Sequence, residues 1–272
     1  LARHDPMRSN AVGSALGDDM RCAVDHLHQR RHAIRAVMLQ GAGSTFCAGT
    51  DCYGPRIDAH IAAHVAARMG PCTAARIAVL HRSRDASCSP VMHLPCSGGN
   101  PYSQGSPSLA EGARSLLESV QGFVGLRRLQ VPVVSAVHGA MVGGAAAIFL
   151  HADVRVAETT ATFQHGNLSR GVCPVAGYSR TLKAAIGTSS ALAYYLTDLV
   201  VAAPCALELG LVHAVRTGIE GAKRAAHHLA RRMAFNHRAS GAAHLGHCPI
   251  PAQLLLVETI AHMECQDRKK HN

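Results

Sequence analysis

An apolar strand that runs into two adjacent glycines is the feature that most constrains the fold of this chain. Residues 135–153 read SAVHGAMVGGAAAIFLHAD, with Gly143 and Gly144 between two apolar runs. A short apolar run closed by glycine is typical of a buried strand, and the longer run that follows is typical of a helix. The stretch contains no carboxylate before Asp153. The stretch therefore resembles an active-site turn that carries no catalytic carboxylate.

Strand, glycine turn and helix recur in this order, which predicts an α/β fold. Apolar spacing predicts a helix over 11–29, a strand over 34–43 and a second helix over 109–129. Later elements are predicted from the segments DVRVAE, SSALAYYLT, APCALELGLV and AQLLLVETIAHMEC. Residues 70–108 are rich in Ser, Pro, Gly and Cys and show no sustained period, so we expect an irregular insertion there.

Length and composition indicate one large domain, because 272 residues with 48% hydrophobic content can bury a sizeable core. We predict a core over 1–200 and a C-terminal helical region over 201–272. The first residue is Leu, and no strand pattern precedes Pro6. We interpret this beginning as typical of a piece of a longer protein.

The formal net charge of +10 predicts an anionic partner. Basic residues are scattered and aromatic residues make up only 4% of the chain, so a phosphate-bearing small molecule is favoured over nucleic acid. No apolar run reaches the roughly 18 residues of a membrane span, and we expect no membrane partner and a cytoplasmic location. The ten cysteines include no CxxC pair, so neither a metal site nor a redox pair is predicted.

Two glycine-marked turns follow predicted strands, GAGSTFCAGTD over 41–51 and HGAMVGGAAA over 138–147. Backbone N–H groups at such turns point toward one spot, and a helix that begins there adds partial positive charge. Glycine also lets the backbone approach a ligand closely. Two such turns that face each other would form an oxyanion hole.

On these motifs the chain resembles the crotonase superfamily, whose best-known class is enoyl-CoA hydratase. The matching stretches cover roughly three quarters of the chain in the family's order; they are DPMRSNAV, VMLQGAGSTFCAGTD, VPVVSAVHGAMVGGAAAIFLHADVRVAETTATF, GVCPVAGYSRTLKAAIG and YYLTDLVVAAPCALELGLVHAV. The resemblance implies a ββα spiral fold with a C-terminal helical trimerisation region, and a homotrimer or hexamer. It also implies an acyl thioester of CoA or of an acyl carrier protein as ligand, with no cofactor beyond the substrate's own CoA or phosphopantetheine.

By position in this resemblance, the backbone N–H groups of Thr50 and Gly144 would hold the thioester oxygen and stabilise an enolate. The neighbouring residues expected to bind the ligand are Ala48, Gly49, Asp51 and Arg56. Arg56 would anchor a carboxylate or phosphate, whereas Asp51 would tie the turn together.

The family pattern includes two glutamates, and this chain has neither of them at the corresponding positions. One falls on Ala147 and the other on Asn167, and the segments 119–152 and 159–197 contain no Asp or Glu at all. Hydration needs a general base and a general acid, and loss of one such group costs ~10²–10⁴-fold in rate. A hydratase is therefore disfavoured.

Decarboxylation of a β-carboxyacyl thioester needs only a stabilised enolate, as in the crotonase-like decarboxylases of polyketide β-branching that the chain resembles. Tyr53 and His165 are the candidate proton donors, and Asn167 would bind a substrate hydroxyl or carboxylate. The alternative is a non-catalytic member that binds acyl thioesters or acts as a scaffold. Cys47 and Cys173 border the expected pocket, and we interpret both as small buried hydrophobes.

Overall fold

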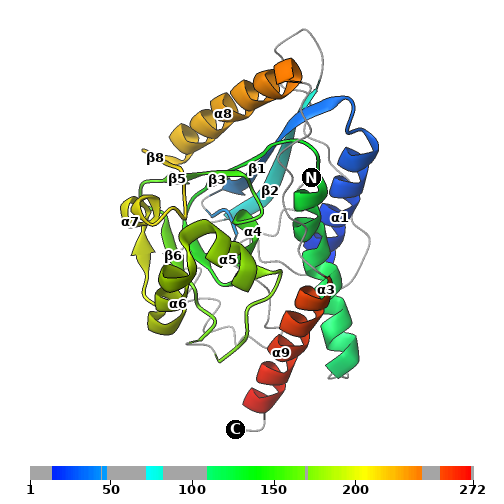
Figure 1. The fold of residues 1–272 in the computed structure, drawn as a ribbon, viewed down its shortest axis with the longest axis vertical. Helices are drawn as coiled ribbons and strands as arrows, with labels where there is room; N and C mark the ends of the chain where they lie inside the picture. The colour runs from blue at the N-terminus through cyan, green and yellow to red at the C-terminus, as the bar shows by residue number, and fades with distance from the viewer. Residues whose placement is uncertain are drawn as a thin grey trace.

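The computed structural model describes residues 14–43, 45–47, 72–81, 109–168, 171–240 and 252–270. The helices within these ranges are α1 (Ser14–Gln29), α3 (Leu109–Gly125), the 3₁₀ turn η3 (Leu126–Arg128), α4 (Gly144–Phe149), α5 (Tyr178–Ile186), α6 (Thr188–Thr197), α7 (Ala203–Glu208), α8 (Ile219–Ser240) and α9 (Ala252–Lys270). The strands are β1 (Ile34–Gly43), β2 (Cys72–His81), β3 (Val133–Val137), β4 (Ala140–Val142), β5 (Val154–Glu158), β6 (Thr162–Gln164), β7 (Val201–Ala202) and β8 (Ala214–Arg216). Figure 1 shows their arrangement. The predicted α/β fold is confirmed.

A five-stranded sheet in the order β2-β1-β3-β5-β8 forms the centre of the fold. β1, β3, β5 and β8 are parallel, with Val37 opposite Val133 and Val134 opposite Val154. All five residues of β3 are buried, as expected for a parallel strand with both faces covered. A smaller sheet, β4-β6-β7, lies beyond the end of β3 in the chain and carries the turn into α4.

Helix α8 covers one face of the main sheet (Figure 1). Its alanines at every fourth position, Ala222, Ala226, Ala230 and Ala234, form one buried stripe against β1, β3 and β5. Small side chains at this spacing let the helix lie close to the sheet. Met38 on β1 and Val134 on β3 belong to the same cluster.

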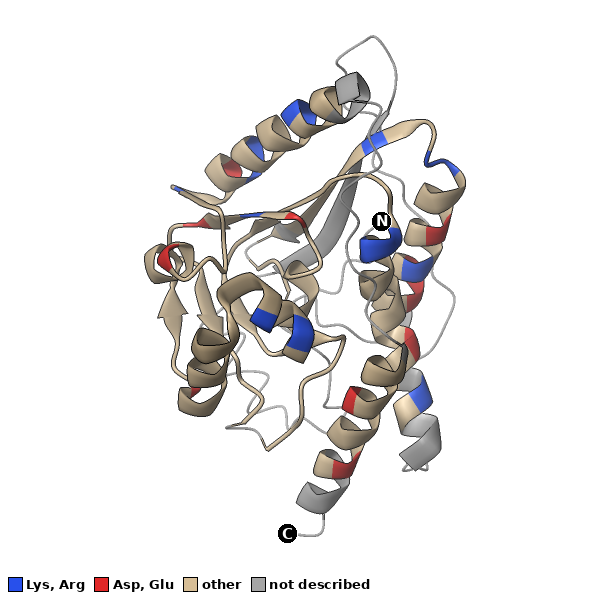
Figure 2. Ribbon diagram, in the orientation of Figure 1, with Lys and Arg blue, Asp and Glu red and all other residues tan. Residues whose placement is uncertain are grey.

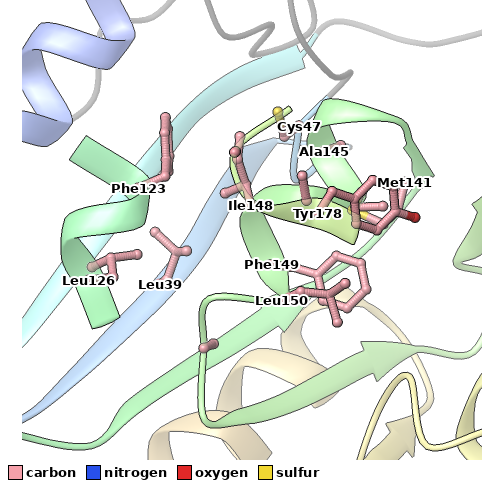
Figure 3. Packing of buried hydrophobic residues seen from close by; sticks show 14 of the residues in the cluster. Leu39, Cys47, Phe123, Leu126, Met141, Ala145, Ile148, Phe149, Leu150 and Tyr178 are labelled. Carbon is pink, nitrogen blue, oxygen red and sulfur yellow. The ribbon is translucent and has the colours of Figure 1, made fainter. Parts of the chain in front are cut away.

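The opposite face of the sheet packs against α4, and alternate strand residues supply the contact. Leu39 joins Val137 in the larger core cluster, on the opposite side of β1 from Met38, as the period of two requires. Figure 3 shows Ile148 of α4 between Phe123 of α3 and Tyr178 of α5. The short helix α4 is therefore held on several sides by apolar side chains.

Helices α1 and α3 cross at two glycines. A Cβ on Gly17 would stand 2.3 Å from the Cα of Ser119, and one on Gly122 would stand 2.4 Å from the backbone nitrogen of Arg21. Only residues without a Cβ allow this backbone contact. Helix α9 packs along α3, so segments more than 100 residues apart in the sequence lie side by side (Figure 1).

The expectation of an irregular segment over 70–108 is wrong for residues 72–81, which form β2. This strand pairs antiparallel with β1, with Val37 opposite Val79 and Leu39 opposite Ile77. Its extended conformation comes from pairing with the edge of the sheet, which no local pattern reveals. The rest of the expected insertion lies outside the described residues. Of the helices that the structure describes, none has the length and apolarity needed to cross a membrane.

Candidate functional site

The segments that carry the two glycine turns are joined by backbone and side-chain contacts. The N–H of Phe46 donates to the carbonyl oxygen of His138 at 3.0 Å. The His138 ring is buried, and its Nε2 lies 2.8 Å from the carbonyl oxygen of Gly43. Because a carbonyl can only accept, Nε2 carries the proton and donates. Burial lowers the pKa of His138, so this ring is a neutral structural link.

The first turn requires a glycine at position 41. A Cβ there would stand 2.4 Å from the Cα of Phe46, because the chain folds back on the end of β1. Cys47 follows and is 4% exposed, as predicted for a small buried hydrophobe. The predicted site residues Ala48, Gly49, Thr50, Asp51, Tyr53 and Arg56 lie outside the described residues.

The second turn places Gly144 at the start of α4. Gly143 precedes it with φ of 56° and ψ of −112°, in the left-handed half of φ space. The N–H of Gly143 donates to the carbonyl oxygen of Gln164 at 3.3 Å, and its carbonyl accepts from Ala147 at 3.0 Å. The N–H of Gly144 precedes the first intrahelical bond, so the helix itself offers it no acceptor. The role of this amide as a donor to a ligand oxygen stays a prediction.

Neither position expected to hold a catalytic carboxylate offers one. Ala147 is fully buried in α4. Asn167 is 5% exposed, and its side-chain NH₂ donates to the carbonyl oxygen of Cys173 at 3.0 Å. That bond fixes the orientation of the amide and leaves Oδ1 without a hydrogen-bond partner among the described residues. Since a Cβ on Gly143 would stand 3.7 Å from this oxygen, Asn167 presents an acceptor beside the start of α4.

His165 lies in a cluster of aromatic rings close to Asn167 in the chain. Its ring stacks on Tyr178 with 4.5 Å between centroids and meets the edge of Tyr195 at 4.7 Å. Burial lowers the pKa of His165 to about 4, although the nearby Asp198 opposes the shift. The imidazole is therefore neutral at pH 7. It does not supply the imidazolium proton that a histidine donor near neutral pH would need.

Asp198 supports the loop that carries His165. Its carboxylate accepts the N–H of Gly166 at 2.5 Å, and its carbonyl oxygen accepts the side-chain NH₂ of Gln164 at 3.0 Å. Asp198 itself has a φ of 49° at the end of α6. Sequence reasoning missed this role, because the bonds join segments more than 30 residues apart.

Two polar residues of α9 contact the loop that follows Asn167. Glu258 is 7% exposed and accepts the N–H groups of Gly177 at 2.6 Å and Ser179 at 3.3 Å, together with the Ser179 hydroxyl. Burial raises the pKa of Glu258, and these hydrogen bonds oppose the shift. His262 Nδ1 lies 2.6 Å from the carbonyl oxygen of Cys173. Glu258 thus caps the start of α5, a role that the sequence did not indicate.

The segments 119–152 and 159–197, which include α4 and α5, contain no Asp or Glu. α5 carries Lys and Arg but no Asp or Glu, as Figure 2 shows. Two acids that contact the loop between β6 and α5, Asp198 and Glu258, accept backbone N–H groups. No group of three or more His, Cys, Asp and Glu side chains is arranged for a metal ion within the described ranges. The site thus offers an amide donor at Gly144, an amide acceptor at Asn167 and a neutral imidazole.

Residues 96–254 match the family model described as enoyl-CoA hydratase/isomerase. A probable enoyl-CoA hydratase of Mycobacterium leprae is 31% identical over 184 residues, which cover 66% of this chain and 48% of that relative. The chain therefore spans about half the length of this relative. A short-chain-enoyl-CoA hydratase of Clostridium acetobutylicum is 32% identical over 93 residues, which cover 34% of this chain and 36% of that protein.

Solved structures with the same fold cover nearly all of the chain. An enoyl-CoA hydratase/isomerase structure from Acinetobacter baumannii has a TM-score of 0.60 at 19% identity and covers 97% of this chain and 95% of that one. An enoyl-CoA hydratase from Mycobacterium avium subsp. paratuberculosis has a TM-score of 0.60 at 20% identity, with 96% and 87% coverage. At these identities the likeness concerns the fold, and the predicted crotonase-like ββα fold is confirmed.

Proposed function

Because this chain belongs to the enoyl-CoA hydratase/isomerase family, we propose that it binds an acyl thioester and stabilises its enolate, with decarboxylation favoured over hydration. The ligand would carry CoA or the phosphopantetheine of an acyl carrier protein. A net charge of +10 supports an anionic ligand of this kind. The chain spans about half the length of its relative from Mycobacterium leprae, and we propose the same activity for the full-length protein.

The choice rests on the expectation from the sequence that the two glutamates of the family pattern fall on Ala147 and Asn167 in this chain. A buried alanine can neither take nor give a proton, and the Asn167 amide is held by Cys173. Hydration would then lack both of its proton-transfer groups. Decarboxylation removes no proton, so it is the reaction of this class that tolerates the two replacements best.

In the proposed reaction the bond between the α-carbon and the substrate's β-carboxylate breaks, and CO₂ leaves. The electron pair moves into the thioester carbonyl, which becomes an enolate oxygen. The N–H groups of Thr50 and Gly144 would donate to that oxygen. A proton then returns to the α-carbon, from Tyr53 or from water, and Arg56 would anchor the carboxylate before it leaves.

The neutral state of the surroundings supports the same choice. A carboxylate beside the reacting carbon would repel a β-carboxyacyl substrate, and the segments 119–152 and 159–197 contain none. Neutral His165 adds no negative charge to the region. The enolate oxygen would be the main site of developing charge, next to the amide at the start of α4.

A second candidate is a family member that binds thioesters without turnover. The expected loss of both glutamates also favours binding without turnover, because decarboxylation still needs a proton source and a group that anchors the substrate's carboxylate. Tyr53 and Arg56 are the candidates for those roles, close to the register that the decarboxylases of polyketide β-branching use but not in it.

Turnover of defined thioesters separates these proposals. The purified chain would be incubated with malonyl-CoA, methylmalonyl-CoA, crotonyl-CoA and malonyl-loaded acyl carrier protein, with the leaving carboxylate labelled with ¹³C. We expect labelled CO₂ from a β-carboxyacyl thioester and no hydration of crotonyl-CoA. Hydration at ordinary rates would contradict the proposal. Binding of these thioesters without any turnover would replace it with the non-catalytic role.

A further inference from the structure

Two cysteines that lie far apart in the sequence meet beside the candidate site. Cys173 Sγ, in the loop before α5, lies 3.6 Å from Cys265 Sγ on α9. Neither cysteine is in a disulfide bond, and both are half-buried. A disulfide bond is about 2.05 Å long, so the sulfur atoms need to approach by only about 1.5 Å. The interpretation of Cys173 as a small buried hydrophobe is wrong, because the residue is only half-buried.

Both cysteines are held in place by their neighbours. The carbonyl oxygen of Cys173 accepts the Asn167 NH₂ at 3.0 Å and lies 2.6 Å from His262 Nδ1. His262 is one helical turn before Cys265, and Glu258 lies one turn further back on the same face of α9. Glu258 accepts the N–H of Gly177, so contacts at Cys173 and four residues after it hold the loop against α9.

We propose that Cys173 and Cys265 form a peroxide-sensitive disulfide site. Hydrogen peroxide oxidises one thiolate to a sulfenic acid, and one oxygen of the peroxide leaves as water. The second thiol then attacks the sulfenic sulfur, a second water leaves, and the S–S bond forms. Two thiols are thus oxidised by two electrons, and one peroxide is reduced to two waters. A dithiol reductant reverses the reaction by exchange.

The bond would connect α9 to the residue that orients Asn167. Cys173 and Cys265 are 92 positions apart, so their disulfide closes a long loop that includes α5, α6, α7 and α8. Oxidation would fix the contact between α9 and the carbonyl that holds the Asn167 amide. The inference concerns the cysteines alone, and it stands whether or not the chain turns over a thioester.

The other thiols of the described chain provide the comparison. Cys22 and Cys205 are exposed, and Cys47 is buried. Cys205 has better access to peroxide than the half-buried pair, yet the structure records no second sulfur beside it within the described residues. Proximity therefore predicts that Cys173 and Cys265 form the intramolecular link, whereas access alone predicts oxidation of Cys205.

The test is peptide mapping of the whole reduced chain after exposure to equimolar hydrogen peroxide. Remaining thiols are blocked with N-ethylmaleimide, and the protein is cut with trypsin and Glu-C. We expect the tryptic peptide of residues 171–180 to be linked to the peptide that begins at Cys265, at two hydrogen atoms below the summed mass. Cleavage after Glu258 and Glu264 separates Cys265 from Cys248.

Three single substitutions complete the test. C173S and C265S should each abolish the link, whereas C205S should leave its yield unchanged. Dithiothreitol should restore two blockable thiols in the unmodified sequence. Maleimide on both Cys173 and Cys265 after peroxide treatment, or a link from either one to a different cysteine, overturns the proposal.

Discussion

The side-chain oxygen of Asn167 lies next to Gly143, only 3.7 Å from the position that a Cβ on Gly143 would occupy. This neighbour is at ordinary contact distance, so space alone would permit an alanine. The backbone does not, because Gly143 has a φ of 56°. The turn before α4 therefore depends on glycine for its conformation rather than for its volume.

Replacement of Gly143 by alanine should lower the free energy of unfolding by about 1–2 kcal/mol, the cost of a left-handed conformation for a residue with a Cβ. Urea denaturation measures the change. Gly221→Ala is the matched control, since Gly221 lies in α8 and its nearest neighbour would be 3.9 Å from the new Cβ. Equal stability changes in the two variants would show that the turn imposes no strain.

The stability of the fold should fall below neutral pH because of His165. Its pKa is about 4 in the folded chain, against an ordinary value of 6.5. The unfolded chain therefore binds the proton first, and the folded state loses about 3 kcal/mol between pH 7 and pH 4 from this group. His165→Phe, which keeps a ring beside Tyr178, should remove this part of the pH dependence. His228→Phe on the exposed side of α8 should not.

Arg155 should be a major stabilising residue although it is a buried cation. Its guanidinium donates to the carbonyl oxygens of Leu211 at 2.6 Å, Ala152 at 3.1 Å and Gly210 at 3.3 Å. Burial, with Arg127 nearby, lowers the pKa of Arg155 to about 10, so it remains charged at pH 7. Arg155→Met leaves three acceptors without this donor and should cost about 3 kcal/mol or more of unfolding free energy.

The control for Arg155 is Arg216→Met, because Arg216 is exposed at the end of β8. Its loss should change the unfolding free energy by less than about 0.5 kcal/mol. Thermal or urea unfolding at pH 7 compares the two variants directly. A loss at Arg155 as small as that at Arg216 would contradict the role given to the three carbonyl contacts.

The amide of Gly144 should matter for turnover more than for stability. Gly144→Pro removes the N–H at the first helical position, where proline is tolerated, and should lower kcat/KM for a β-carboxyacyl thioester by about 100-fold or more. Gly144→Ala keeps the N–H and should retain most activity. Circular dichroism confirms that both variants fold. Similar kcat/KM values for the proline and alanine variants would exclude the amide as an oxyanion donor.

We propose that the apolar face of α9 contacts neighbouring subunits in a trimer, as the sequence analysis expected. Leu256, Val257 and Ile260 are 48%, 63% and 37% exposed on this helix. Val257→Glu should therefore reduce the molar mass measured by light scattering to that of one chain. Lys223→Glu on α8 is the control. An unchanged mass in the Val257 variant would place the subunit contact elsewhere.

The sequence predicted the elements whose signal is local. β1, β3 and β5 are apolar runs that end at or next to a glycine or a charged residue. Each strand was predicted within a few residues of its bounds. β2 was missed, because its strand conformation depends on pairing with β1. An isolated segment within a stretch rich in Ser and Pro shows no sign of a partner strand.

The candidate site was predictable only in part, for the same reason. The resemblance to the crotonase superfamily predicts Gly144 and Asn167 as site residues, whereas the carbonyl of Cys173 that orients Asn167 is recognised only in three dimensions. The cap that Glu258 forms on α5 joins residues about 80 positions apart. The low pKa of His165 depends on the rings that bury it, which local sequence does not specify.

The proposed function requires that the amides of Thr50 and Gly144 donate to one thioester oxygen. The most direct test is a crystal structure of the chain with a non-decarboxylating malonyl-CoA analogue. We predict both nitrogen atoms within about 3 Å of the same carbonyl oxygen, with Ala147 and Asn167 beside the α-carbon. A thioester bound elsewhere, or amides that point to different atoms, would contradict the proposed function.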